Sequence, residues 1–135
     1  MYSHQTKIRV RYGETDQMGY MYYGNYAELY EVGRVEMLRS LGMTYKSMED
    51  QGVMMPVLEM RCKYFKPALY DEELTINVIL EKMPGVKIHF KYEFFNETGD
   101  LIHEGETTLA FIDMKRNRPC APPPDFQNRL KQFFN

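Results

Sequence analysis

One long helical pattern, from about Asn25 to Leu41, constrains the fold of this chain more than any other feature of its sequence. Its apolar residues recur at helical spacing and therefore fall on one side of the predicted helix. Such a helix must bury that side against another element. Gly33 lies on this side, and a glycine there favours close packing on a sheet. The apolar side comprises Tyr26, Leu29, Tyr30, Gly33, Met37 and Leu41.

The surface that covers this helix is predicted from alternating apolar and polar residues in the rest of the chain. One alternating segment precedes the helix and four follow it, mostly separated by short turn sequences, which favour antiparallel pairing. We therefore expect an α+β fold, with a five-stranded antiparallel sheet wrapped around one long central helix, as a single domain over residues 1–135. The predicted strands cover residues 7–12, 54–64, 74–81, 86–94 and 101–113, with further helices over 44–51 and 126–134.

The composition is that of an ordinary globular protein, with 44% hydrophobic and 27% charged residues in a chain of 135. A formal net charge of −2 gives no reason to expect nucleic acid as a partner. No apolar segment is long enough to span a bilayer, and no signal-peptide pattern is present, so we expect no membrane insertion. Cys62 and Cys120 lack the spacing of a metal or redox pair, which favours a reduced, cytoplasmic protein.

The three histidines do not have the spacing of metal ligands, so we expect neither a metal nor a cofactor. His4 lies in an N-terminal segment that we expect to be frayed. His89 falls on the polar face of its predicted strand, and His103 is isolated in the sequence. We therefore expect all three to be solvated surface residues.

The segment between the first strand and the long helix, residues 12–26, is the part of the sequence that most suggests chemistry. Asp16 comes a few residues before the helix N-terminus, where unpaired N–H groups and the helix dipole can stabilise an oxyanion. A carboxylate beside such a terminus can assist attack on a carbonyl. From spacing alone, a turn or capping aspartate is the simpler interpretation of Asp16. We expect the nearby Glu14 to be solvated.

The same segment resembles the hotdog-fold acyl-CoA thioesterases of the 4-hydroxybenzoyl-CoA thioesterase and YbgC-like family. Those proteins carry the pattern T/C-D-x-x-G-x-x-[YW]-x-x-N-Y, followed on the helix by F-E-x-x-R-x-E. The separated matches keep one register over nearly the whole chain, which makes the resemblance specific. The matching residues are Thr15-Asp16, Gly19, Tyr22, Asn25-Tyr26, Tyr30-Glu31, Arg34 and Glu36, with Arg118-Pro119 near the C-terminus.

The resemblance implies an acyl-CoA thioester hydrolase that releases a free carboxylic acid and CoA. It assigns Asp16 as the nucleophile or general base, and the backbone N–H of Tyr23 as the group that polarises the thioester carbonyl. YbgC-like proteins often have histidine at position 23, so a main-chain role is expected here and an imidazole role is not. Gly19 is expected to adopt a positive φ or to allow a close backbone approach. Hotdog dehydratases use a histidine that has no counterpart near Asp16, which favours hydrolysis.

The substrate-binding residues are predicted in two groups. Methionine and tyrosine side chains near Asp16, or on the strand facing the helix, are predicted to line the acyl channel. Basic residues at strand ends are predicted to neutralise the phosphates of CoA. The channel residues are Met18, Met21, Tyr22 and Met54, and the phosphate-binding residues are Lys63, Lys66, Arg116 and Arg118.

Two alternatives remain open from the sequence. A non-catalytic acyl-CoA or lipid-binding hotdog protein would share the fold, although an intact Asp16 favours the enzyme. An acyl carrier protein could present the thioester in place of CoA, because both carriers use the same phosphopantetheine arm. Active sites of the family lie between subunits, and a five-stranded sheet leaves an edge to cover. We therefore expect a homodimer joined edge to edge, or a homotetramer.

Overall fold

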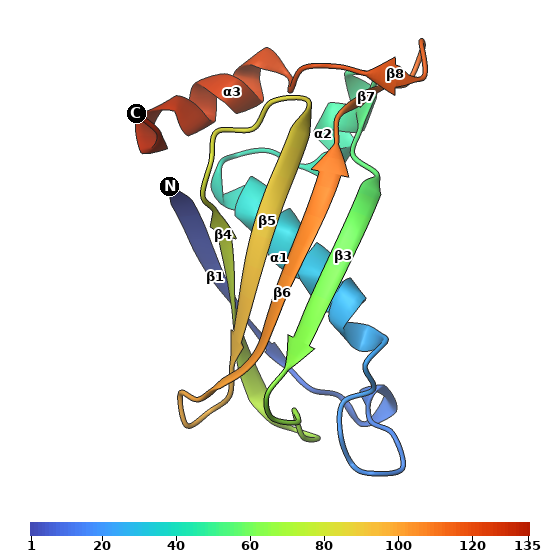
Figure 1. Ribbon diagram of the computed structural model, residues 1–135, viewed down its shortest axis with the longest axis vertical. Helices are drawn as coiled ribbons and strands as arrows, with labels where there is room; N and C mark the ends of the chain where they lie inside the picture. The colour runs from blue at the N-terminus through green and yellow to red at the C-terminus, as the bar shows by residue number, and fades with distance from the viewer.

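The computed structural model describes residues 1–135 and contains a five-stranded antiparallel sheet in the order β1-β4-β5-β6-β3. Helix α1 (Asn25–Ser40) crosses one face of this sheet (Figure 1). The predicted α+β class and five-stranded antiparallel sheet are therefore confirmed. The strands are β1 (Tyr2–Arg9), β3 (Val57–Tyr64), β4 (Glu73–Leu80), β5 (Lys87–Phe95) and β6 (Leu101–Ala110).

The shorter elements gather at one end of the sheet, at the top of Figure 1. A small second sheet has the order β2-β7-β8. No helix has both the length and the apolar character that crossing a bilayer requires. The elements at this end are α2 (Tyr45–Asp50), β2 (Val53–Met54), β7 (Ile112–Asp113), β8 (Arg118–Pro119) and α3 (Pro124–Leu130), which a 3-10 turn (Lys131–Phe133) follows. A second 3-10 turn, Tyr12–Glu14, lies at the opposite end of the molecule.

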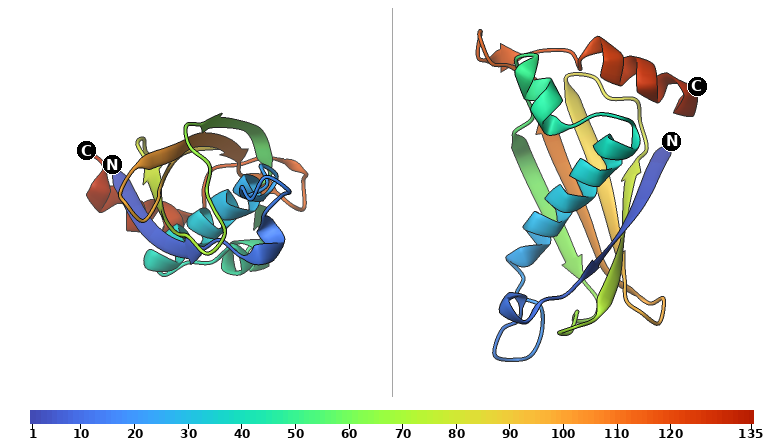
Figure 2. Two further views of the ribbon diagram at one scale, coloured as in Figure 1. Left: turned by 90° about the horizontal axis from the view of Figure 1, so that it is seen from below. Right: turned by 180° about the vertical axis from the view of Figure 1, so that it is seen from behind.

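Helix α1 packs on the sheet through the side that the sequence predicts. All six predicted apolar positions are buried, and Arg34 and Leu38 widen the buried side. A Cβ atom at Gly33 would lie 2.6 Å from Cγ2 of Val78, so a larger residue would force the helix and sheet apart. Gly42, with φ of +79°, follows the helix and allows the chain to turn at its C-terminus. Figure 2 shows the sheet curving, with α1 on its inner side.

The N-terminal segment differs from its prediction. Strand β1 covers Tyr2–Arg9 rather than residues 7–12, and His4 pairs with Val78 of β4. The expectation of a frayed N-terminus is therefore wrong. The Tyr2 ring packs 4.5 Å from that of Phe133, and the N-terminal amine donates to the Phe133 carbonyl. These contacts with the C-terminal segment hold the strand, and a local sequence pattern does not reveal them.

The sheet topology also departs from a simple series of hairpins. Strand pairs β4–β5 and β5–β6 are consecutive, as expected, but β3 lies at the far edge beside β6. Pro56 falls between β2 and β3, so the predicted strand over 54–64 is two strands. Proline has no N–H to contribute to a ladder, which explains the interruption. Phe111 likewise separates β6 from β7.

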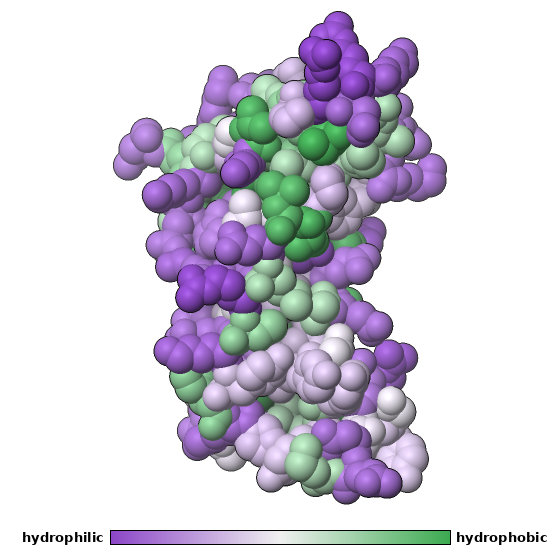
Figure 3. Space-filling model, turned by 45° about the vertical axis from the view of Figure 1, so that its right-hand side comes forward, coloured by the Kyte–Doolittle hydropathy of each residue, from purple (hydrophilic) through white to green (hydrophobic).

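Strand β3 is an edge strand, and its apolar side chains are open to solvent. Val57, Leu58 and Met60 are 48%, 54% and 48% exposed. Figure 3 brings the β3 side of the molecule forward and shows hydrophobic side chains gathered along the middle of this face. An exposed apolar edge strand is a natural surface for pairing with another strand.

Candidate active site

The loop before α1 holds the Asp16 carboxylate by one of its two oxygens. Oδ1 of Asp16 accepts hydrogen bonds from the N–H groups of Met18 at 2.9 Å and Tyr20 at 3.2 Å. The loop is closed by a bond from Asp16 N to the Tyr20 carbonyl at 2.8 Å. Gly19 has φ of +78°, as predicted. Oδ2 of Asp16 has no hydrogen-bond partner in the protein, so it remains available to react.

The N-terminus of α1 presents N–H groups that the protein does not use. No side chain caps the helix at Gly24. The N–H groups of Tyr23 and Gly24 have no acceptor, whereas that of Asn25 donates to the Tyr22 carbonyl at 3.0 Å. The Tyr22 ring lies against Gly24, where an added Cβ would be only 2.6 Å from Cε2 of that ring. Two free donors therefore stand at the positive end of the helix dipole.

A cavity of about 330 Å³ joins these two features, since both Asp16 and Tyr23 line it. Its walls are mostly apolar and aromatic, as in small-molecule sites generally. Of the residues predicted from the sequence, Asp16, Met18, Met21, Tyr23 and Lys66 line this cavity. The other lining residues are Tyr20, Tyr26, Tyr64, Phe65 and Pro67.

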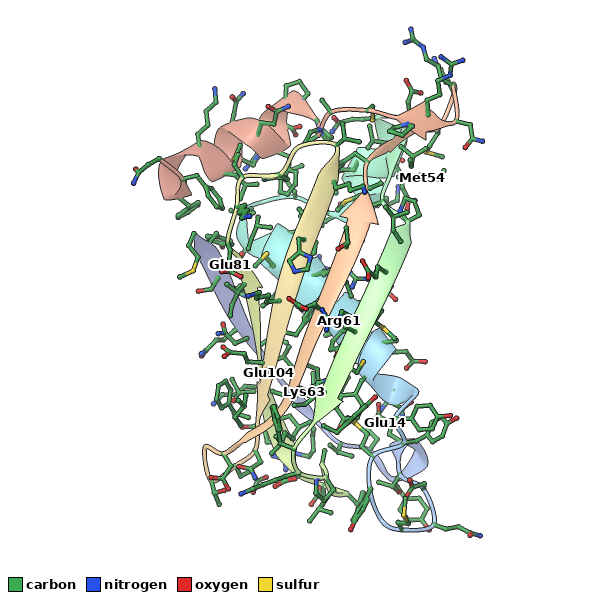
Figure 4. The ribbon with its side chains drawn as sticks, viewed as in Figure 1. Glu14, Met54, Arg61, Lys63, Glu81 and Glu104 are labelled. Atoms are coloured by element: carbon green, nitrogen blue, oxygen red, sulfur yellow. The ribbon has the colours of Figure 1, made fainter.

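The structure does not bring the remaining predicted residues into this cavity. Gly19 and Tyr22 belong to the same loop but do not line it. Lys63 lies on the outer face of the sheet, in register with Glu104, while Met54 lies at the opposite end of the molecule from the Asp16 loop (Figure 4). Strand β8 is at Met54's end too, because β7 pairs with both β2 and β8. Arg116 and Arg118 belong to this hairpin and are exposed.

A histidine that the sequence interpretation placed on the surface packs behind the cavity, against the lining residue Tyr26. His103 is fully buried, so that expectation is wrong. Its ring stacks on Tyr26 with centroids 4.1 Å apart, and Nε2 hydrogen-bonds the Tyr30 hydroxyl. Burial lowers the pKa of His103 to about 4 and raises that of Tyr26 to about 12. Both side chains are therefore neutral near pH 7; Tyr26 lines the cavity, and His103 supports Tyr26 from behind.

A sequence signal for this burial exists in the alternation of β6. Residues 103, 105, 107 and 109 share one face of the strand, and the other face carries Glu104 and Glu106. The charged face points to solvent, so His103 must point inward. Gly105 on the inward face leaves room for the Tyr30 hydroxyl, which a Cβ there would overlap.

Comparison with known proteins agrees with this geometry. Residues 10–130 match the thioesterase-like superfamily. The chain belongs to that superfamily. This thioesterase-like chain is 34% identical over 119 residues to YneP of Bacillus subtilis (strain 168), which is provisionally named an acyl-CoA thioesterase; the match covers 88% of this chain and 86% of YneP. It is 30% identical over 125 residues to the acyl-CoA thioester hydrolase YbgC of Escherichia coli O6:H1, with 93% of each chain covered.

Solved structures of similar fold lead to the same superfamily. The DHNA-CoA thioesterase of Staphylococcus aureus superimposes with a TM-score of 0.92 at 35% identity, over 98% of this chain and 91% of that one. A 4-hydroxybenzoyl-CoA thioesterase variant superimposes with a TM-score of 0.82 at 18% identity, over 94% of this chain and 97% of that one. The second likeness concerns the fold alone. The resemblance to the hotdog-fold thioesterases is confirmed.

The segment that contains Asp16 has a second acidic residue, Glu14, and its burial corrects the expectation that it is solvated. Glu14 was expected to be solvated, but it is only 8% exposed. Its Oε1 accepts from the Arg11 N–H at 2.8 Å and lies 3.3 Å from Nε of Arg11. The carboxylate thereby closes the 3-10 turn Tyr12–Glu14 on itself. Unlike Asp16, it does not line the cavity.

Proposed function

We propose that this chain hydrolyses acyl-CoA thioesters in the cavity beside Asp16 and releases a free carboxylic acid and CoA. One observation carries the proposal: Asp16, with its free Oδ2, and Tyr23, with its free N–H, line one cavity. Family membership and the names of the curated relatives support the same class of enzyme. The class follows from those comparisons, and the roles of individual residues are our proposal.

The geometry suits an addition to a carbonyl carbon. The thioester oxygen would accept from the N–H groups of Tyr23 and Gly24, which stabilise it as negative charge develops. Oδ2 of Asp16 then either takes a proton from an attacking water or itself attacks the carbonyl, forming an anhydride that water opens. In both routes the C–S bond breaks, the electron pair leaves on the CoA thiolate, and the thiolate takes up the proton released by water.

The lining of the cavity divides between the two parts of the substrate. We assign the acyl group to Met18 and Met21, together with the aromatic walls. Lys66 stands at the cavity with its Nζ 3.2 Å from Asp100, and it would face the CoA phosphates. Tyr22, through its contact with Gly24, would shape the entrance.

Three further predicted residues, Met54, Arg116 and Arg118, enter the proposal through a second copy of the chain. Pairing β3 antiparallel with β3 of another copy would set the start of one strand beside the end of the other. Met54, Arg116 and Arg118 of one subunit would then approach the cavity of its partner, whereas Lys63 lies near the middle of the outer face. We propose at least a homodimer of this kind, with a homotetramer as a larger form.

Three coarser features complete the proposal. We treat residues 1–135 as one hotdog domain, with α1 as its central helix. We place the activity in the cytoplasm, where Cys62 and Cys120 would stay as the free thiols seen here. No cofactor is required, because the reaction needs only water, a base and an oxyanion site.

The experiment is thiol release from a panel of acyl-CoA and acyl carrier protein substrates, for the wild type and Asp16→Asn. Asparagine keeps the Oδ1 acceptor that holds the loop, so the melting temperature should stay near that of the wild type. Its amide cannot act as a base, and kcat should fall about 10²–10⁴-fold.

Asp125→Asn on α3, an exposed aspartate far from the cavity, is the matched control and should keep wild-type turnover. Near-normal turnover in a stable Asp16→Asn variant would contradict the catalytic role. No thiol release by the wild type on any substrate would favour a non-catalytic acyl-CoA or lipid-binding protein.

A further inference from the structure

The main-chain carbonyl of Glu14 is a junction between the Asp16 loop and helix α1. It accepts the N–H of Tyr22 at 2.8 Å and the side-chain amide Nδ2 of Asn25 at 2.8 Å. Glu14 precedes Asp16 by two residues, Tyr22 precedes Tyr23, and Asn25 is the first residue of α1. One oxygen therefore ties the 3-10 turn that leads into the Asp16 loop to the segment that carries the free N–H donors.

Each side of this junction is fixed independently. The Glu14 carboxylate is buried and accepts the Arg11 N–H at 2.8 Å, which locks the turn from which the carbonyl projects. On the other side, the Asn25 N–H donates to the Tyr22 carbonyl at 3.0 Å. The carbonyl thus has little freedom to move relative to either partner.

The side chain of Asn25 joins the helix to the loop that precedes it. Gly24 is the N-cap residue of α1, and Asn25 is the first helical residue, so its side chain is not at the capping position. Here no side chain caps α1, and the Asn25 amide donates back to the preceding loop instead. The Asn25 amide therefore joins the helix to the loop, and the N–H groups of Tyr23 and Gly24 have no acceptor in the protein.

We propose that Asn25 and Glu14 are positioning residues for thioester hydrolysis, which hold the Asp16 carboxylate and the free N–H donors of α1 at a fixed separation. The proposal rests on the proposed function, because the separation matters only when one carbonyl must meet both groups. Neither residue touches the substrate in it. A misplacement of about 1 Å between reacting groups costs about 10²-fold in rate, so the loss of the hydrogen bonds to the Glu14 carbonyl should have a measurable effect.

The first test compares Asn25→Ala with Glu28→Ala, an exposed residue in the same first turn of α1. Loss of the Asn25 amide should lower kcat about 10- to 100-fold and leave KM nearly unchanged, because the cavity walls remain in place. The pH profile of kcat should keep its shape, since the substitution leaves the reacting carboxylate in place. Glu28→Ala should keep wild-type kcat. An Asn25→Ala variant with wild-type kcat, or with a raised KM alone, would overturn the proposal.

The second test uses the carboxylate of Glu14. Glu14→Gln keeps the Oε1 acceptor for the Arg11 N–H, whereas Glu14→Met removes it at similar length. Most of kcat should survive in Glu14→Gln and be lost in Glu14→Met. Equal kcat in the two variants would contradict a positioning role for Glu14. This pair also answers the question if Asn25→Ala does not fold.

Hydrogen exchange separates this proposal from the proposed function. In Asn25→Ala, the amides of residues 16–22 should exchange faster than in Glu28→Ala, while those of β4 and β5 should not change. A wild type that releases no thiol would defeat the proposed function even if this exchange result holds. Unchanged hydrogen exchange across residues 16–22 would contradict the positioning role of Asn25 even if the wild type is an active thioesterase.

Discussion

The two ends of this molecule carry different parts of the site that we propose. At one end, the Asp16 loop and the start of α1 provide a carboxylate, two free N–H donors and an aromatic cavity, with Lys66 as the cation that lines it. At the other end, the β7–β8 hairpin carries the exposed cations Arg116 and Arg118 beside β2. That end also holds a carboxylate by one oxygen, because Oδ1 of Asp113 accepts the N–H groups of Lys115 and Arg116, but Asp113 does not line the cavity.

The comparison separates the groups that one chain supplies by itself from those that a second copy can supply. The groups for bond breaking need sub-ångström placement, and they come from one continuous loop of 12–24 and the helix that follows. Groups that bind CoA phosphates act over longer range and tolerate looser placement. They can therefore be supplied by another copy through the exposed edge strand β3.

The largest difference between the ends is expected from a pair of glycine substitutions. In Gly24→Ala, the new Cβ would meet the Tyr22 ring at 2.6 Å and displace either the ring or the helix start. We expect kcat to fall about tenfold or more. Gly52→Ala meets no atom within 4 Å but is strained by its φ of +85°. It should lose about 1 kcal/mol of stability and keep its kcat. Equal kcat losses in the two variants would remove the functional contrast between the ends.

A smaller effect, on binding rather than on chemistry, is expected at the hairpin. The double variant Arg116→Ala/Arg118→Ala should raise KM for acyl-CoA several-fold, to about tenfold, with kcat unchanged. The increase should shrink at high salt, because ions screen the exposed charges. Lys7→Ala, which removes an exposed cation paired with Glu73 on the opposite sheet edge, is the control. A fall in kcat at unchanged KM would mean that the hairpin acts in the chemical step and not in substrate binding.

The smallest effect concerns His103, which packs behind the cavity against Tyr26. The folded-state pKa of His103 is lowered from 6.5 to about 4 by burial, so the unfolded chain binds more protons between these values. Stability should therefore fall as the pH drops from about 6.5 towards 4, by about 3 kcal/mol at most. Urea unfolding of His103→Gln should show a flatter pH dependence than the wild type. His89→Gln, on the exposed face, should retain the full slope. Parallel slopes for all three proteins would mean that His103 does not titrate in this range.

Sequence reasoning succeeded where the determinants are local. The apolar side of α1 follows from helical spacing, and Gly19 with its positive φ follows from the loop motif. The position of Asp16 before a helix N-terminus is equally local. Its interpretation as more than a turn residue required the family pattern, because the same dipeptide serves in ordinary turns.

The expectations that failed depend on contacts between distant segments. Strand β3 lies beside β6 rather than β4, and neighbouring sequence carries no signal for that choice. Glu14 is buried because α1 folds back over its turn, with Asn25 bonded to its carbonyl from eleven residues away. His103 is buried by Tyr26 and Tyr30 of α1, a contact between the first third of the chain and β6.

The account's central claim, that the two ends complete one site across two copies, is tested most directly by mixing subunits. Asp16→Asn and the Arg116→Ala/Arg118→Ala variant are each assayed below the wild-type KM, then unfolded together, refolded and assayed again. If subunits share sites, half of the mixed dimers' sites carry neither change, and about a quarter of wild-type activity should return in an equal mixture. Activity equal to the mean of the two separate variants would contradict the shared site and confine all of the chemistry and binding to one chain.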